Sequence, residues 1–377
     1  MTLLRAFLFF AVLALTSGCN GGSPIETISP SQKQSFGEVG GQTSGPNSSV
    51  LIARPHVPYN RHREDRDKAW MAPRAGSLDL LYVSDEGTND VYVYSWPQAD
   101  LVGKLTHVSY PQGECTDAAG HVFITSFAPS YGSRILKYIH AGTRPILRIQ
   151  DKGYFASGCA IDPRTGNLAV TNLETTDLSF GNVAIYDRRG RLLGLYAGGG
   201  MAFYFFCGYD SAGDLFVDGG RDYNPFEGFA FAELPAGTSA LSAITLDQAI
   251  DYPGGVQWDG SHVAIGDTNH NVIYEFSISG SAGTKVGETP LDGGSYVLQF
   301  WIQGKKVVGP NAGTGMVAIW PYPSGSKATK LLPNFTDPVG TVVSVKGSKP
   351  HARPSPDTDA LTHAARRASQ RINPRSI

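Results

Sequence analysis

Short runs of β-branched and aromatic residues, separated by polar turns, fill residues 78–346. Within these runs the pattern has a period of two, as where Val and Tyr alternate over residues 91–94. A period of two is typical of β-strands, whereas an amphipathic helix repeats every 3.6 residues. No stretch between residues 20 and 346 has a sustained helical apolar stripe. The pattern therefore predicts an all-β chain.

One motif returns along the chain at an almost constant spacing. An acidic residue opens a Gly-containing turn and a β-branched strand follows, as in Asp162-Pro-Arg-Thr-Gly166 and then Asn167-Leu-Ala-Val-Thr171. The equivalent acids are Asp117, Asp162, Asp210 and Asp259, which lie 45, 48 and 49 residues apart. A period in the forties made of short strands is typical of a β-propeller, in which each repeat forms one four-stranded blade.

The repeats predict six blades, the first of which takes strands from both ends of the repeat region. Residues 80–84 and 90–94 supply its second and third strands, but no first strand precedes them. Residues 338–345 supply the missing strand, and this pairing of N- and C-terminal strands would remove the free edges of an open ring. The expected blades span 78–106 with 337–346, 107–150, 151–198, 199–247, 248–291 and 292–334.

The composition agrees with this fold, and the balance of charge bears on which classes of partner the protein binds. The 45 Gly and 24 Pro among 377 residues suit a chain full of turns and would be costly in long helices. The 31 basic and 33 acidic residues nearly balance, so no strong field favours nucleic acid or acidic partners overall.

The two ends of the chain differ from the repeats. Residues 1–19 read as an export signal, because Arg5 precedes an apolar run over 6–15 that is too short to span a bilayer. Leu15-Thr-Ser-Gly-Cys19 resembles a bacterial lipobox, which predicts that Cys19 carries lipid; the alternative is an ordinary secretory signal cut near Gly18. Asn20 after the Cys suggests the outer membrane, by resemblance to lipoprotein sorting rules. We expect a flexible tether and lead-in over 20–75, the propeller over 76–347 and a disordered basic tail over 348–377.

The three remaining cysteines occupy similar places in successive repeats. Cys115 lies two residues before its repeat acid, and Cys159 and Cys207 lie three before theirs. Because successive side chains of a strand face opposite ways, Cys159 and Cys207 should not meet, whereas Cys115 and Cys159 point toward one another or apart. A bridge fits an oxidising compartment. Buried free thiols are the interpretation that we favour from the sequence alone.

Candidate ligand residues follow the second strand of each repeat, where propeller loops converge on the central channel. The candidates there are Asp85, Glu86, Asn172, Glu174, Asp218, Arg221, Asp267 and Asn311, and Glu114, on an inner strand, could face the same channel. Oxygen donors gathered round one axis could hold a hard cation such as Ca²⁺. The alternative is that these residues bond their own loops, as Asp and Asn do in turns.

With the repeats aligned, the chain resembles six-bladed NHL/YVTN-repeat propellers of the gluconolactonase-like superfamily. Leu81-Tyr-Val-Ser-Asp85 and Leu168-Ala-Val-Thr-Asn172 carry this resemblance, which covers residues 78–346. In lactonases of this group, a Glu in an E-G-P-x-W context helps to bind a divalent metal. That context is absent here, and Glu114 lies in the wrong blade to replace it. The resemblance therefore supports the fold and argues against lactonase chemistry.

These observations together predict a non-enzymatic, lipid-anchored propeller that binds a small ligand or another protein in the bacterial cell envelope. One alternative is a metal-dependent hydrolase or lyase with its site at the channel mouth. The other is a purely structural module of an envelope complex.

Overall fold

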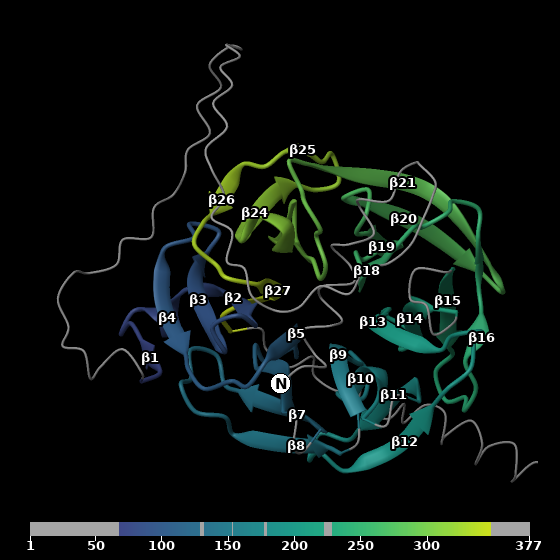
Figure 1. The fold of residues 1–377 in the computed structure, drawn as a ribbon, viewed down its shortest axis with the longest axis horizontal. Helices are drawn as coiled ribbons and strands as arrows, with labels where there is room; N and C mark the ends of the chain where they lie inside the picture. Colours follow the sequence, from purple (N-terminus) through teal and green to yellow (C-terminus); the bar gives the residue numbers. More distant parts are fainter. Residues whose placement is uncertain (1–67, 129–131, 153, 177–178, 222–227, 348–377) are drawn as a thin grey trace, which may run out of the picture. The chain divides into compact units, whose positions relative to one another are not determined.

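The computed structural model describes residues 68–128, 132–152, 154–176, 179–221 and 228–347. These residues form six sheets arranged in a ring, with short helices only at η2 (Ala75–Ser77) and η3 (Ala312–Thr314) (Figure 1). The predicted all-β, six-bladed propeller is confirmed. The predicted signal, Cys19, the tether up to residue 67 and the C-terminal tail lie outside the described residues. None of the helices in the described ranges is long and apolar enough to cross a membrane.

Each blade is a meander of antiparallel strands that starts at the ring's inner edge. Blade 1 contains β27 (Pro338–Ser344), β2 (Asp79–Asp85), β3 (Asp90–Trp96), β4 (Leu101–Leu105) and β1 (Trp70–Met71). Blade 2 contains β5 (Pro111–Thr116), β6 (Val122–Ala128), β7 (Gly132–Tyr138) and β8 (Leu147–Asp151). Blade 3 contains β9 (Tyr154–Ile161), β10 (Leu168–Thr175), β11 (Phe180–Tyr186) and β12 (Leu192–Tyr196).

The other half of the ring is less regular at its outer edge. Blade 4 contains β13 (Phe203–Tyr209), β14 (Leu215–Gly220), β15 (Phe229–Leu234) and β16 (Ser242–Ala243). Blade 5 contains β18 (Pro253–Trp258), β19 (Val263–Asp267), β20 (Val272–Ser279) and β21 (Ala282–Asp292), and β17 (Thr245–Leu246) and β25 (Ser326–Lys327) pair with β21. Blade 6 contains β22 (Trp301–Gln303), β23 (Lys306–Asn311), β24 (Met316–Pro321) and β26 (Lys330–Leu332).

Blade 1 joins the two ends of the described chain. β27 pairs antiparallel with β2, with Leu80 opposite Ser344 and Val83 opposite Thr341. At the outer edge, Trp70 and Met71 pair with β4, although the sequence placed these two residues in the flexible lead-in. Their pairing adds a fifth strand to blade 1, because Met71 packs its side chain on the apolar cluster that holds this blade against blade 2.

The core lies between neighbouring blades, where alternate residues of each strand face the next sheet. Trp320, Tyr82 and Tyr204 are the largest side chains that are completely buried. Threonine hydroxyls add polar links, because each donates a hydrogen bond to a carbonyl of the next blade. The links are Thr125 to Ser157 at 3.2 Å, Thr171 to Phe205 at 2.8 Å and Thr268 to Val297 at 3.1 Å.

Cys115 and Cys159 form a disulfide between the inner strands of blades 2 and 3. Our preference for free thiols at these two positions was wrong. The opposite phases of the two residues point their side chains toward one another, and their Cα atoms are 5.6 Å apart. Cys207 is free and buried, as its phase predicted, and burial raises the pKa of its thiol.

Candidate functional site

Three of the predicted channel-mouth residues form hydrogen bonds with the backbone of their own blades. The carboxylates of Asp85, Asp218 and Asp267 each accept a hydrogen bond, at 2.8 to 3.0 Å, from a backbone amide at or before the inner strand of the same blade. The donors are Asp337 for Asp85, Phe206 for Asp218 and Asp251 for Asp267. Within the described ranges, no three His, Cys, Asp or Glu side chains are placed to hold a metal ion. These three carboxylates therefore bond their own blades, as in the alternative to a cation site that the sequence analysis gives.

Other predicted site residues also form hydrogen bonds with nearby groups. Asn172 donates to the Asn182 side chain at 3.0 Å, and Arg221 donates through Nε to the Phe229 carbonyl at 2.9 Å. Asn311 donates to the Gly293 carbonyl at 3.1 Å and also accepts from the Ser295 amide. Glu174 is buried at the end of β10, and burial raises its pKa to about 7.

Glu114 takes part in a link across the inner edge of blade 1. Its backbone amide donates to Gln299 Oε1 at 2.9 Å, and Gln299 Nε2 donates to the Glu114 carbonyl at 2.7 Å. Gly340 of β27 makes room for this link, because a Cβ there would collide with the Gln112 carbonyl and crowd Gln299. The Glu114 carboxyl is completely buried, accepts from Ser84 at 2.8 Å, and has a pKa raised well above its ordinary value by burial. Its position indicates a structural role.

Glu86 is the channel-mouth carboxyl whose titration is easiest to test. Its side chain is 8% exposed, and Gln112 Nε2 donates to it at 2.9 Å. Burial raises its pKa from 4.5 to about 7, against the opposing effect of the Gln112 hydrogen bond. The unfolded chain therefore binds fewer protons than the folded protein between these values. The stability that this group contributes is complete below about pH 4.5 and is lost as the pH rises through about 7.

We predict that Glu86→Gln flattens the dependence of stability on pH. A neutral amide keeps the hydrogen bond with Gln112 but does not ionise. As the pH rises through neutrality, the free energy of unfolding of the variant should therefore fall by up to about 3 kcal/mol less than that of the wild type. Urea unfolding at several pH values measures the difference. Glu288→Gln, at an exposed site, is the matched control and should run parallel to the wild type. Parallel curves for Glu86→Gln would show that Glu86 is ionised throughout.

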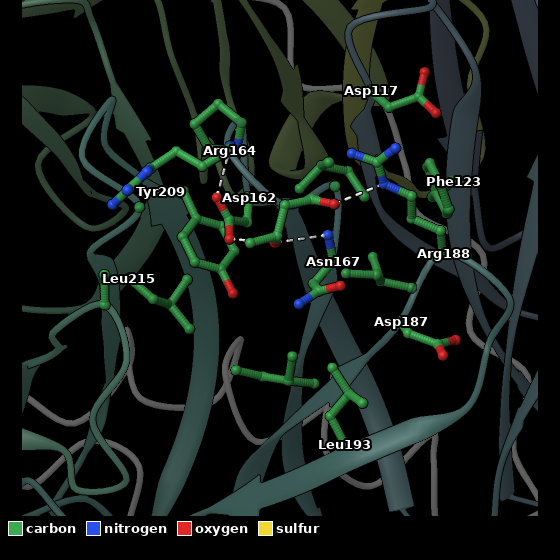
Figure 2. A pocket seen from close by; sticks show the side chains of 18 of the residues that line it. Asp117, Phe123, Asp162, Arg164, Asn167, Asp187, Arg188, Leu193, Tyr209 and Leu215 are labelled. Atoms are coloured by element: carbon green, nitrogen blue, oxygen red, sulfur yellow. Dashed lines mark hydrogen bonds between the residues drawn. The ribbon is translucent and has the colours of Figure 1, made fainter. Parts of the chain in front are cut away.

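A large open groove lies across blades 2, 3 and 4, on the face of the ring opposite the channel-mouth residues. It has a volume of 2070 Å³ and is bordered by the turns that join first to second strands and third to fourth strands (Figure 2). Its apolar wall consists of Phe123, Leu147, Ile149, Ile161, Leu168, Ile185, Leu193, Tyr196, Tyr209, Leu215 and Leu234. A smaller cavity of 270 Å³ between the inner strands adjoins it, since Ile161, Pro163, Tyr209 and Ser211 line both.

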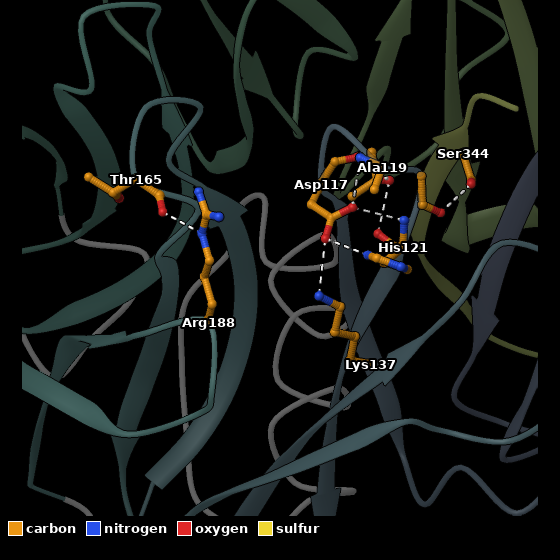
Figure 3. Close-up of polar contacts among 9 residues, drawn as sticks. Asp117, Ala119, His121, Lys137, Thr165, Arg188 and Ser344 are labelled. Carbon is orange, nitrogen blue, oxygen red and sulfur yellow. Dashed lines mark hydrogen bonds and ion pairs between the residues drawn. The ribbon is translucent and has the colours of Figure 1, made fainter. Parts of the chain in front are cut away.

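The aspartates of the groove are already satisfied by their own turns. Asp117 accepts from the His121 amide at 2.9 Å and from Ala119 at 3.0 Å, and it also bonds His121 Nδ1 at 2.8 Å and Lys137 Nζ at 3.1 Å (Figure 3). Burial alone would raise the pKa of Asp117. The hydrogen bond with His121 and the charge of Lys137 outweigh burial and hold this pKa below its ordinary value.

Asp162 and Asp187 follow the same arrangement. Asp162 accepts from the Arg164 amide at 2.8 Å, and Asp187 accepts from the amides of Arg189 and Arg191, each at 2.9 Å. These are Asx turns, in which the side chain replaces a backbone acceptor. The other repeated acids, Asp210 and Asp259, accept in the same way from the amides of their own turns, so the acids that gave the sequence its period shape these turns.

The arginines of the groove retain free hydrogen-bonding capacity. Arg188 donates through Nε to the Thr165 carbonyl at 2.6 Å, and Arg164 donates through Nη1 to the Ala212 carbonyl at 2.7 Å. These single bonds fix each guanidinium while leaving further N–H donors, and Figure 2 shows the two side chains on either side of Asp162. In the part of the chain that the structure describes, the exposed Arg189 side chain has no polar partner. The groove thus combines an apolar wall with cations that are not neutralised.

This groove was not predicted from the sequence, in which the candidate ligand residues belong to the channel mouth on the other face of the ring. One signal was present: Asp187-Arg-Arg-Gly-Arg191 is the densest group of arginines within the repeats. The other turns that border the groove lie 20 to 70 residues away in the sequence, so no local pattern shows that they meet.

No protein-family model matches this chain, and no curated protein matches it in sequence. Its fold is similar to that of a chain in the crystal structure of a nidogen/laminin complex, with a TM-score of 0.58 and 14% identity, over 71% of this chain and 99% of that chain. A protein of unknown function from Bacteroides caccae is similar over the same shares, with a TM-score of 0.53 and 14% identity. At this identity the likeness shows the fold alone. The NHL-type and gluconolactonase-like relationship remains a prediction.

Proposed function

We propose that this propeller is an exported binding module that holds an acidic segment of a partner protein in the groove across blades 2–4. The proposal rests on a difference between the acidic and the basic side chains of this groove: the acids are already bonded, and two of the arginines have free donors. Its aspartates accept hydrogen bonds from their own turns, and two of them are also paired with cations. Arg188 and Arg189, by contrast, keep donors free. Guanidinium groups bind carboxylates through paired, charge-assisted hydrogen bonds. The apolar wall would contact the side chains between the acids.

The occurrence of this fold in a nidogen/laminin complex supports a binding role, although at 14% identity it says nothing of the partner here. The groove also favours a polypeptide over a flat surface, because its wall is recessed between turns of three blades.

Binding to an array of short peptides that share apolar content but differ in charge tests this function. Affinity should rise with the number of acidic residues. Arg188→Glu combined with Arg189→Glu should weaken binding about tenfold or more, because each charge-assisted hydrogen bond contributes ~1.5–3 kcal/mol. Lys305→Glu makes the same kind of charge change in the first turn of blade 6 and should leave binding unchanged. Equal binding of acidic and basic peptides would refute the proposal.

We further propose that the protein is lipid-anchored through Cys19 in the cell envelope, at the outer membrane. The lipobox-like Leu15-Thr-Ser-Gly-Cys19 supports the anchor. The Cys115–Cys159 disulfide supports export, because such bonds persist in oxidising compartments. Several acyl chains on one Cys would anchor the protein stably.

Labelling of cells with a fatty acid tests the anchor. The wild type should incorporate the label and enter the membrane fraction, and Cys19→Ser should do neither. Cys207→Ser, which changes a buried thiol of the propeller, should label like the wild type. Labelling of Cys19→Ser, or an unlabelled wild type, would contradict lipidation.

A further inference from the structure

Strand β12, at the outer edge of blade 3, presents apolar side chains to solvent. Leu192, Leu193 and Leu195 are 46%, 47% and 46% exposed. β12 is the last strand of its sheet, so among the described residues one edge of its backbone has no neighbouring strand. Exposed strand edges of this kind readily pair with another chain.

The outer edges of the other blades differ from β12. β4 is paired with β1, and β21 is paired with β17 and β25 at its two ends. Between these ends β21 exposes Thr284, Val286 and Glu288, of which one is apolar. The last strands of blades 4 and 6, β16 and β26, have only two and three residues. β8 has five residues like β12, but it buries Ile149 and exposes Arg148 and Gln150. β12 is therefore the five-residue outer strand, within the described ranges, that combines an uncovered edge with three exposed leucines.

The turn that leads into β12 carries the groove's densest positive charge. Arg188, Arg189 and Arg191 lie between β11 and β12, and of these Arg191 is paired with Asp187 at 3.2 Å. Leu193 lines the groove together with these arginines. A segment lying along β12 would thus reach the groove's cations at the end where the strand begins.

We propose that an extended segment of the partner protein adds to β12 as a fifth strand of blade 3, antiparallel, with acidic residues at its C-terminal end. This inference rests on the proposed function and specifies how the partner binds. Antiparallel pairing continues the order of blade 3, in which β9, β10, β11 and β12 are all antiparallel to their neighbours. The partner's C-terminal end then lies beside Arg189 and Arg191. Main-chain bonds supply affinity in such strand addition, and side chains supply specificity.

A second copy of this chain fits the same edge less well. Two β12 strands paired antiparallel about Gly194 would match Leu193 with Leu195. Each arginine turn would then face Ala197-Gly-Gly-Gly200 of the other copy, which offers no carboxylate. The charges of the turn therefore favour an acidic partner segment.

The test uses a synthetic peptide of alternating Val and Thr that ends in a pair of Glu, with binding measured by fluorescence anisotropy. Two further peptides carry N-methyl groups on either the odd or the even residues. N-methylation removes backbone donors, so strand addition predicts that one set weakens binding about tenfold or more while the other is tolerated. Hydrogen exchange at residues 192–196 should slow when the unmodified peptide binds.

Protein variants separate the edge from the groove. Leu195→Lys should weaken binding of the unmodified peptide, whereas Val286→Lys, at a 49% exposed site on the outer strand of blade 5, should not. If both methylated peptides bind like the unmodified one, and Arg188→Glu still weakens binding, strand addition is refuted while the groove's function stands. No binding of the unmodified peptide overturns the strand proposal. A dimer of the free protein that Leu195→Lys dissociates also overturns it, in favour of a second copy.

Discussion

Ending the chain after Asn334 is expected to unfold the whole ring rather than loosen blade 1 alone. The truncation removes β27, in which Thr341, Val342 and Ser344 are completely buried. β27 pairs with β2 and lies beside β5 and β23 of the two neighbouring blades. Burial of one Val contributes ~1.5–3 kcal/mol, so loss of its three valines removes much of the roughly 5–15 kcal/mol that stabilises a typical protein. Circular dichroism during thermal unfolding measures the loss.

The matched truncation ends after Gly347 and retains β27. It should melt close to the full-length temperature, because every strand of the described ring is kept. If the two truncations melt together, β27 does not hold blade 1 in solution, and the ring is stabilised by contacts between the other blades.

Replacing both Cys115 and Cys159 by Ala is expected to lower the free energy of unfolding by about 4 kcal/mol. The disulfide joins residues 44 apart in sequence, and the chain-entropy relation for a loop of that length gives about this value. Urea unfolding of the wild type and of the double variant, each with and without reductant, measures the effect.

Reductant should destabilise the wild type and leave the double variant unchanged. Cys207→Ala keeps the bridge and tests loss of a buried thiol alone, which should cost far less and leave the response to reductant intact. A wild type that is insensitive to reductant under conditions where its thiols become titratable would show that the bridge contributes little.

Several features of the candidate site depended on side-chain direction and could not be predicted from spacing. The sequence placed Asp85, Asp218 and Asp267 at one end of the blades, and they are there. Whether a carboxylate faces the axis or its own loop depends on which backbone amides lack a partner nearby. In each of these blades a backbone amide at or just before the inner strand donates a hydrogen bond to the carboxylate. The bonding needs of the backbone therefore set the direction of these three carboxylates.

The all-β class, the six blades and the strand that Pro338–Ser344 adds to blade 1 could be predicted from the sequence, because a period near 45 residues and a period of two within strands are local signals. Packing of the blades was needed to show that Cys115 and Cys159 meet, that Trp70 and Met71 join the sheet, and that turns of blades 2, 3 and 4 enclose the arginine-lined groove. Periodicity fixes which face of a strand is buried. The twist and packing of neighbouring sheets fix which side chains come together, and no spacing along the chain encodes that arrangement.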